Sequence, residues 1–184
     1  MTHPFRNMAP KRTCTKKRAN YKAYKSFLAD DFNHRCGYTD CSDHWFGGKR
    51  NFQIDHFRPE SKYPELKNEY SNLVYCCSYV NRAKCDDDNH NYLDPCDIDF
   101  NLHFERDDLG YIKAKTPQGQ YMVERMNLGL FRYAICWNLD RLEERMKIFE
   151  AKVNQNTASA IDKELLLKMN MEFHEYLRYL RAEL

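Results

Sequence analysis

The residues from 51 to 84 constrain the fold of this chain more than any other segment. Residues 51–56 read as a strand, the stretch "RPESKYPE" that follows reads as a loop with two prolines, and residues 73–77 form a second short β-type run. Residues 78–84 can then open a helix. The order strand, loop, strand, helix predicts a small ββα unit in which the end of the first strand can face the first turns of the helix.

Polar side chains with catalytic chemistry lie at the ends of these predicted elements. Asp55 and His56 end the first strand, Asn72 begins the second, and Asn81 lies in the first turns of the helix. Asp55 and Asn81 can therefore supply two oxygen ligands to one cation. A hard cation such as Mg²⁺ keeps several water ligands, so two protein ligands suffice for it.

The neighbouring residues suggest roles in catalysis. An unperturbed imidazole titrates at about pH 6.5, so His56 suits a general base that takes a proton from water. Lys84 lies one helical turn after Asn81 and can hold negative charge that develops on a phosphate, although a solvated helix lysine is an equal alternative. The amide of Asn72 is expected to bond the backbone across the loop and fix the shape of the site.

The stretch "IDHFRPES", followed by "NLVYCCSYVNRAKCD", resembles the HNH or ββα-metal endonuclease family. The last motif position is Asn81 rather than His, so the pattern is an HNN variant, and it is similar to the HNH domain of the RNA-guided CRISPR nucleases. The resemblance implies hydrolysis of a DNA phosphodiester with one divalent ion, Mg²⁺ or Mn²⁺. It also implies Asp55 and Asn81 as metal ligands, His56 as the base, and a role for Lys84.

The wider layout resembles the small HNH nucleases that are found beside ATPases in bacterial anti-phage systems, of the Septu and retron-associated type. The shared features are the basic start, the loop "HFRPES", a "DPC" segment and a helical tail. This resemblance implies a role in defence, with an ATPase or another subunit of a defence complex as partner.

The cysteines offer a possible structural zinc site. Many HNH proteins hold zinc on two CxxC pairs, but here Cys36 and Cys41 are separated by four residues, and Cys77 is followed by a valine where its partner would stand. These three cysteines can still bind zinc tetrahedrally with His44 or Cys85 as the fourth ligand. Otherwise they are small core residues, which is the usual fate of buried cysteines.

The chain shows no sign of secretion or membrane insertion. It begins with polar residues rather than an apolar signal region, and no run approaches the roughly 18 apolar residues of a membrane span. We therefore expect a cytoplasmic protein with reduced thiols and no membrane partner.

Charge is unevenly placed along the chain. The formal net charge is only +2, yet residues 1–25 contain many basic residues and no acidic ones. A basic arm on a mildly acidic body is typical of contact with a polyanion such as DNA. The expected contacts are Lys16, Lys17 and Arg18, and a solvated terminus is the alternative.

Two arginines near the motif are further candidates for contact with nucleic acid. Arg58 lies in the proline loop and Arg82 in the predicted helix. Both can steer the phosphate backbone of DNA, or they can pair with Glu60 and the acidic run at residues 86–88. The sequence leaves both alternatives open.

The rest of the chain contains further elements. Residues 20–30 read as a short helix capped by Asn20, and the alternating apolar residues of 98–104 predict a half-buried strand that a turn at "RDDLG" joins to "YIKAK" as a β-hairpin. From Gln118 onward the pattern is helical, and Ser159 with Asp162 resembles a capping box between two antiparallel helices. A dimerising coiled coil is the alternative for this tail.

Together these patterns predict an α+β protein with a ββα-metal HNH nuclease core, a β-hairpin and C-terminal antiparallel helices. The expected parts are a basic arm with a short helix at residues 1–28, the core at 29–97, and the hairpin with the helices at 98–184. Hydrophobic residues make up 42% of the chain, which allows a sizeable core. The expected function is that of a metal-dependent DNA endonuclease. The alternatives are a nuclease acting on RNA, a non-catalytic zinc-type module that binds nucleic acid, and an interaction subunit whose helical tail docks a partner.

Overall fold

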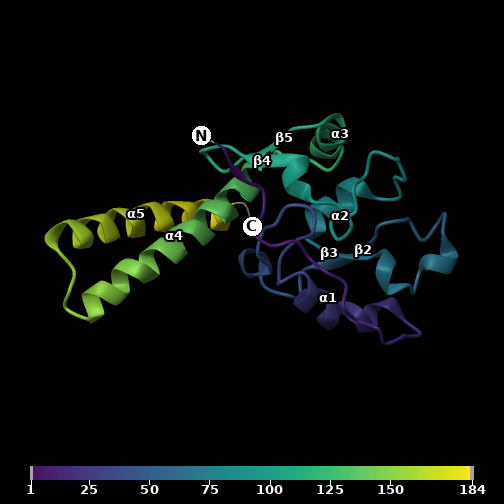
Figure 1. Ribbon diagram of the computed structural model, residues 1–184, viewed down its shortest axis with the longest axis horizontal. Coiled ribbons are helices and arrows are strands. Elements are labelled where there is room, and N and C mark those ends of the chain that lie inside the picture. Colours follow the sequence, from purple (N-terminus) through teal and green to yellow (C-terminus); the bar gives the residue numbers. More distant parts are fainter. Residues whose placement is uncertain (1, 183–184) are drawn as a thin grey trace. The chain divides into compact units, whose positions relative to one another are not determined.

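The computed structural model describes residues 2–182, which form a mixed α and β protein with small sheets (Figure 1). The strands are β1 (His3–Pro4), β2 (Gln53–His56), β3 (Leu73–Cys76), β4 (Phe104–Arg106) and β5 (Ile112–Ala114). The helices are α1 (Lys25–Asp31), α2 (Ser78–Lys84), α3 (Pro117–Arg125), α4 (Phe131–Asn154) and α5 (Ala160–Ala182). The chain forms two compact units, residues 2–133 and 134–182. None of the described helices is long and apolar enough to cross a membrane.

The predicted order strand, loop, strand, helix is confirmed at residues 53–84. Strands β2 and β3 pair antiparallel, with Asp55 opposite Val74 and His56 opposite Leu73, and α2 follows after Cys77. All four residues of β3 are buried, and α1 packs against this strand (Figure 1). In β2 the alternation of faces leaves Asp55 as the buried residue, so an acid occupies a position where strands usually carry an apolar side chain.

The N-terminal segment is part of the fold rather than a separate basic arm. Strand β1 pairs with β4, which pairs with β5 in the predicted hairpin. The Phe5 ring is buried beside Phe100 and Phe104. Arg6 is also buried, and its guanidinium donates to the carbonyl of Gly37 at 2.7 Å.

A second cation of the expected arm also faces inward. Arg12 donates to the carbonyl of Leu73 at 3.0 Å and to the carboxylate of Asp94 at 2.9 Å. Because β1 joins the sheet of β4 and β5, the hairpin belongs to the first unit, and the boundary between units falls after Tyr133 rather than at residue 97.

The strand expected at residues 98–104 is wrong for most of its length. Residues Phe100–Leu102 form a 3₁₀ turn, and β4 begins only at Phe104. The carboxylate of Asp99 accepts the backbone N–H of Asn101 at 3.0 Å, and such a local bond competes with an extended strand. Leu102, which the alternation placed on the buried face, is 64% exposed.

The helical region begins with a separate short helix. The hydroxyl of Thr116 caps α3 by accepting the backbone N–H of Gly119, and Pro117 occupies the first turn. Gly119 lies close to the preceding chain, since a Cβ there would approach the carbonyl oxygen of His103 to 2.5 Å. Asn127 has a positive φ of 53° and lies in the turn between α3 and α4.

The second unit contains the predicted pair of antiparallel helices (Figure 1). Leu142 and Met146 of α4 pack against Met169 of α5 in its core. The capping box is confirmed, since Asp162 accepts the backbone N–H of Ser159 at 2.9 Å and donates its own to the Ser159 hydroxyl at 3.1 Å. These bonds fix the start of α5 immediately after the turn.

Candidate active site

Asp55 lies at the centre of a buried group of polar side chains. One carboxylate oxygen accepts the hydroxyl of Tyr38 at 2.6 Å and the other accepts the ammonium of Lys84 at 3.1 Å. Burial raises the pKa of the Asp55 carboxyl, while the charge of Lys84 and the bond from Tyr38 partly offset that rise. Burial and the neighbouring Asp55 raise the pKa of Tyr38, so the phenol stays protonated and donates.

Lys84 does not lie where a phosphate contact was expected. Its side chain is fully buried, and its ammonium donates to the backbone carbonyl of His56 at 2.9 Å as well as to Asp55. The alternative interpretation of Lys84 as a solvated helix lysine is also wrong, because the side chain is buried. The ammonium balances the charge of the Asp55 carboxylate and ties the end of β2 to α2.

The imidazole of His56 is held by two contacts. Its Nε2 lies 2.9 Å from the carbonyl oxygen of Lys67, and its ring meets the ring of Tyr21 edge-on with centroids 4.7 Å apart. A carbonyl oxygen only accepts hydrogen bonds, so Nε2 carries the proton in the neutral ring. Nδ1 is then the nitrogen that can accept a proton.

Asn72 closes the loop between the two strands, as expected from the sequence. Its side-chain oxygen accepts the backbone N–H of Arg58 at 2.8 Å, and its amide donates to the carbonyls of Arg58 at 3.0 Å and Leu66 at 3.4 Å. This loop carries Lys67, whose carbonyl holds His56. Asn72 therefore acts on the site through the backbone of the loop.

Asn81 and Asp55 line the same hollow, which also includes His56 and measures about 740 Å³. We call it the site hollow. The Asn81 amide donates to the side-chain oxygen of Gln53 at 2.7 Å, which leaves the Asn81 oxygen as an acceptor. Each carboxylate oxygen of Asp55 has a second lone pair, so the two residues retain the oxygen ligands that a hard divalent cation prefers.

Asp86 is a further carboxylate in the wall of the site hollow. It lies two residues after the end of the expected helix, in the acidic run at residues 86–88. The sequence indicates this run only as a partner for Arg58 and Arg82. Cys85, between the helix and Asp86, has a positive φ of 49° and turns the chain at the end of α2. This turn brings Asp86 back to the wall that Asn81 lines.

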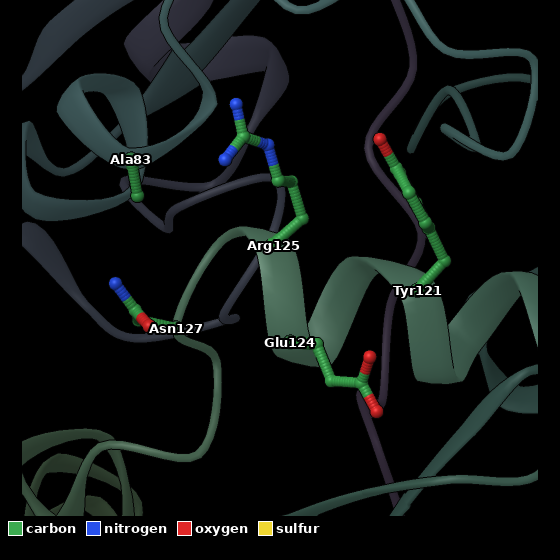
Figure 2. A pocket seen from close by; sticks show the side chains of 5 residues that line it. All are labelled: Ala83, Tyr121, Glu124, Arg125 and Asn127. Carbon is green, nitrogen blue, oxygen red and sulfur yellow. The ribbon is translucent and has the colours of Figure 1, made fainter.

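The next acid fixes the chain that leaves α2. The Asp87 carboxylate accepts bonds from the hydroxyls of Tyr92 at 3.1 Å and Tyr121 at 2.8 Å and from Arg125 at 2.8 Å. Tyr121 and Arg125 project from α3 into a separate pocket of about 390 Å³ that Ala83 of α2 also lines (Figure 2). Helix α3 thus holds the chain at the end of α2 through Asp87.

The cysteines expected to bind zinc are buried but are not arranged as a metal site. The Cys77 backbone N–H donates to the sulfur of Cys36 at 3.5 Å, and the thiol of Cys41 lies 3.7 Å from the carbonyl oxygens of Thr39 and Tyr133. Burial raises the pKa of the Cys36 thiol, but hydrogen bonds from Cys77 and Thr39 outweigh burial and lower it to about 6.

Within residues 2–182, no three His, Cys, Asp or Glu side chains are grouped so that they could hold a metal ion. His44 is exposed and its ring contacts Trp45, while Cys85 lines the site hollow. The second cysteine pair is incomplete because Val80, which is fully buried, occupies the position of the missing thiol.

The basic residues expected to contact DNA have different surroundings. Arg58 pairs with Asp88 at 2.9 Å. This favours pairing with the acidic run at residues 86–88 over contact with the DNA backbone. The exposed Arg82 lies over the ring of Tyr79. Lys16, Lys17 and Arg18 are exposed, as a contact with a polyanion requires.

Tyr38, Tyr21 and Lys67 complete the site, although no sequence signal points to them. Tyr38 lies 17 residues before Asp55, and Lys67 acts through its backbone carbonyl, which every residue type offers. Comparison of the chain with protein-family models, curated proteins and solved structures gives no match. The candidate site therefore depends on the geometry of this chain.

Proposed function

We propose that this protein is a metal-dependent HNH-type endonuclease that hydrolyses phosphodiester bonds of DNA. One observation carries the proposal. Asp55 and His56 of β2 and Asn81 of α2 line one hollow, while a backbone carbonyl holds Nε2 of His56 and leaves Nδ1 as the basic nitrogen. An acid and an amide beside an oriented imidazole are what metal-assisted hydrolysis requires.

The residues of the site hollow have distinct tasks in this reaction. Asp55 and Asn81 would hold Mg²⁺ or Mn²⁺, which polarises the phosphate and stabilises the leaving oxygen when bound. Nδ1 of His56 takes a proton from water, the water oxygen forms a new bond to phosphorus, and the bond from phosphorus to the leaving oxygen breaks. The leaving oxygen keeps the electron pair of that bond and takes a proton from solvent. The Lys67 carbonyl accepts the Nε2 hydrogen before and after this transfer, so the ring keeps its orientation.

Lys84 and Asn72 serve this chemistry as positioning residues. The Lys84 ammonium favours the ionised form of Asp55, and a carboxylate must be ionised to bind a cation. Asn72 holds the loop that carries the Lys67 carbonyl. The zinc-module alternative has less support, because the Cys36 sulfur accepts the Cys77 backbone N–H and the Cys41 thiol lies against two carbonyl oxygens, whereas the site hollow gathers the catalytic set.

The wider resemblance extends the proposal to a biological role. A layout similar to small anti-phage nucleases supports a cytoplasmic defence effector that works with an ATPase or another complex subunit. The test is protection of a bacterial host that carries the intact defence system. We expect the His56→Ala substitution in this chain to abolish protection against phage, and full protection by that variant would argue against the nuclease as effector.

A supercoiled-plasmid assay tests the activity directly. The protein is incubated with Mg²⁺, with Mn²⁺ or with EDTA, and the His56→Ala variant is treated in the same way. Nicked or linear product that requires both the metal and His56 is the expected result. His174→Ala is the matched control, since His174 is exposed on α5 in the second unit, and this variant should cut like the wild type. Equal cleavage by His56→Ala and the wild type would refute the mechanism, and cutting confined to an RNA substrate would favour the RNA alternative.

A further inference from the structure

A second hollow adjoins the site hollow in the first unit. The two share Tyr21, Ile54 and Asn81 in their walls. The second hollow measures about 630 Å³, within the range of about 300–1,000 Å³ that is typical of ligand sites. A ligand that fills one hollow can therefore continue into the other past these shared residues.

All the charged residues in the wall of the second hollow are basic. Lys22, Lys25 and Arg50 lie in its wall, and no acidic residue does; we call it the cationic hollow. Across the described part of the chain, none of these three side chains has a carboxylate within ion-pair distance. The Lys25 ammonium instead donates to the carbonyl of Arg50 at 3.0 Å, which keeps two cationic residues together.

A fourth cation adds to this crowding. The ammonium of Lys49 lies 3.3 Å from the hydroxyl of Ser26, next to Lys25 in the chain. Partial burial and the charge of Lys49 lower the pKa of Lys25. Cations that are crowded without counter-charges repel one another, and a bound anion relieves that repulsion.

The two hollows differ in the charges of their walls. The site hollow has the acids Asp55, Glu60 and Asp86 together with the cations Lys67 and Arg82 in its wall, whereas the cationic hollow has no acid to balance its cations and so favours an anion. Each strand of duplex DNA carries one phosphate per about 3.4 Å of helix axis. A strand that places one phosphate at a metal ion in the site hollow can therefore bring its next phosphates into the cationic hollow.

We propose that the cationic hollow binds the phosphate backbone of DNA on one side of the cleaved bond, with Lys22, Lys25 and Arg50 as the phosphate contacts. The position of the cleaved bond rests on the proposed function, whereas binding in the hollow does not depend on catalysis. Four neighbouring cations, counting Lys49, suit a polyanion better than a single small anion, which one or two cations satisfy.

The test is a variant with Lys25→Gln and Arg50→Gln. Binding of a labelled DNA duplex is measured by fluorescence anisotropy over a series of salt concentrations, with EDTA present to prevent cleavage. We expect affinity near physiological salt to fall about tenfold, and the slope of log K against log salt concentration to shrink by about 1.8, since each lost phosphate contact removes about 0.9. The control carries Lys113→Gln in β5 of the other sheet and Lys115→Gln just after that strand. It removes the same charge and should bind like the wild type.

Equal affinities and slopes for the test and control variants would overturn the inference. A second measurement uses the wild-type protein with a DNA whose linkages are neutral methylphosphonates, so it does not depend on the folding of any variant. The wild-type protein should lose its salt-dependent affinity for this DNA, and undiminished binding would also overturn the inference. Weaker binding by the test variant, together with a wild type that cuts no DNA, would reject the proposed function but not the hollow. Normal cleavage by the wild type, together with unchanged DNA binding by the test variant, would reject the hollow but not the proposed function.

Discussion

At the residue scale, the buried pair of Lys84 and Asp55 is expected to matter for both stability and metal binding. Both side chains are at most 5% exposed, so Lys84→Met leaves a buried carboxylate without its cation. Removing one partner of a buried ion pair typically costs about 3–5 kcal/mol. Chemical denaturation at neutral pH measures this loss. The double variant with Asp55→Asn should recover part of it, and a loss below about 1 kcal/mol in Lys84→Met would contradict the structure.

The pH dependence of this variant follows from the pKa of Asp55. Burial already raises that pKa, and without Lys84 it rises further. A carboxyl whose pKa is higher in the folded state destabilises the fold at neutral pH, and the penalty disappears as the pH falls and the group becomes protonated. The stability difference between Lys84→Met and the wild type should therefore shrink from pH 7 toward the acid range. A stability difference that grows as the pH falls would contradict the assignment of Asp55 as the buried partner of Lys84.

The sequence located part of this site and not the rest for a physical reason. Asp55, His56 and Asn81 lie within one local ββα segment, so spacing alone indicates that they share a hollow. The role of Lys84 depends on burial, which helical spacing does not reveal. The contact of Tyr38 with Asp55 bridges two separate segments, and only the packed chain brings them together.

At the element scale, the loop at residues 57–72 depends on Asn72. The Asn72→Ala variant loses two bonds to Arg58 that join the ends of this loop and a third bond to Leu66 within it, and the Lys67 carbonyl that orients His56 should then shift. A misplacement of about 1 Å at a catalytic group can cost about 100-fold in rate. We expect a loss of that size in plasmid cleavage with nearly unchanged Mn²⁺ affinity by calorimetry. Asn89→Ala, in a different loop, is the control, and wild-type cleavage by Asn72→Ala would contradict this role.

The capping box of α5 makes the helical unit sensitive to acid. The backbone N–H of Ser159 and the Lys152 ammonium lower the pKa of Asp162 to about 2. A carboxyl with a lowered pKa stabilises the fold above its unfolded pKa, about 3.9, and loses that contribution as the pH falls through the folded value. Helicity followed by circular dichroism should therefore melt at lower temperature between about pH 4 and pH 2. In Asp162→Ala this part of the pH dependence should vanish, and an identical profile in the variant would exclude the cap as its cause.

Helix boundaries show where local patterns suffice at this scale. Residues 159–162 and 78–84 were predicted correctly because capping and apolar spacing act within one turn of the chain. The strand expected at residues 98–104 failed because apolar alternation does not reveal the turn that Asp99 caps. Leu102 is exposed as a result, and only Phe100 and Phe104 of that run join the core.

At the scale of the whole molecule, the N-terminal segment connects the parts of the first unit. Pairing of β1 with β4, burial of Phe5 and the bond from Arg6 to Gly37 join residues that are far apart in the sequence. A basic stretch suggests a loose arm when it is read by charge alone, because charge does not show which cations turn inward. Lys16, Lys17 and Arg18 by contrast are exposed.

Deletion of residues 1–12 should therefore destabilise the first unit rather than merely weaken DNA binding. The deletion removes the edge strand β1 and the buried Phe5 ring, and loss of a buried Phe side chain alone typically costs about 3–5 kcal/mol. We expect a clear drop in the melting temperature by calorimetry. The control replaces Lys16, Lys17 and Arg18 by Gln, which should leave melting unchanged but lower the salt dependence of DNA binding. If the deletion melts like the wild type and only its salt dependence falls, residues 1–12 act as a tail and their packing into the sheet is not required for stability.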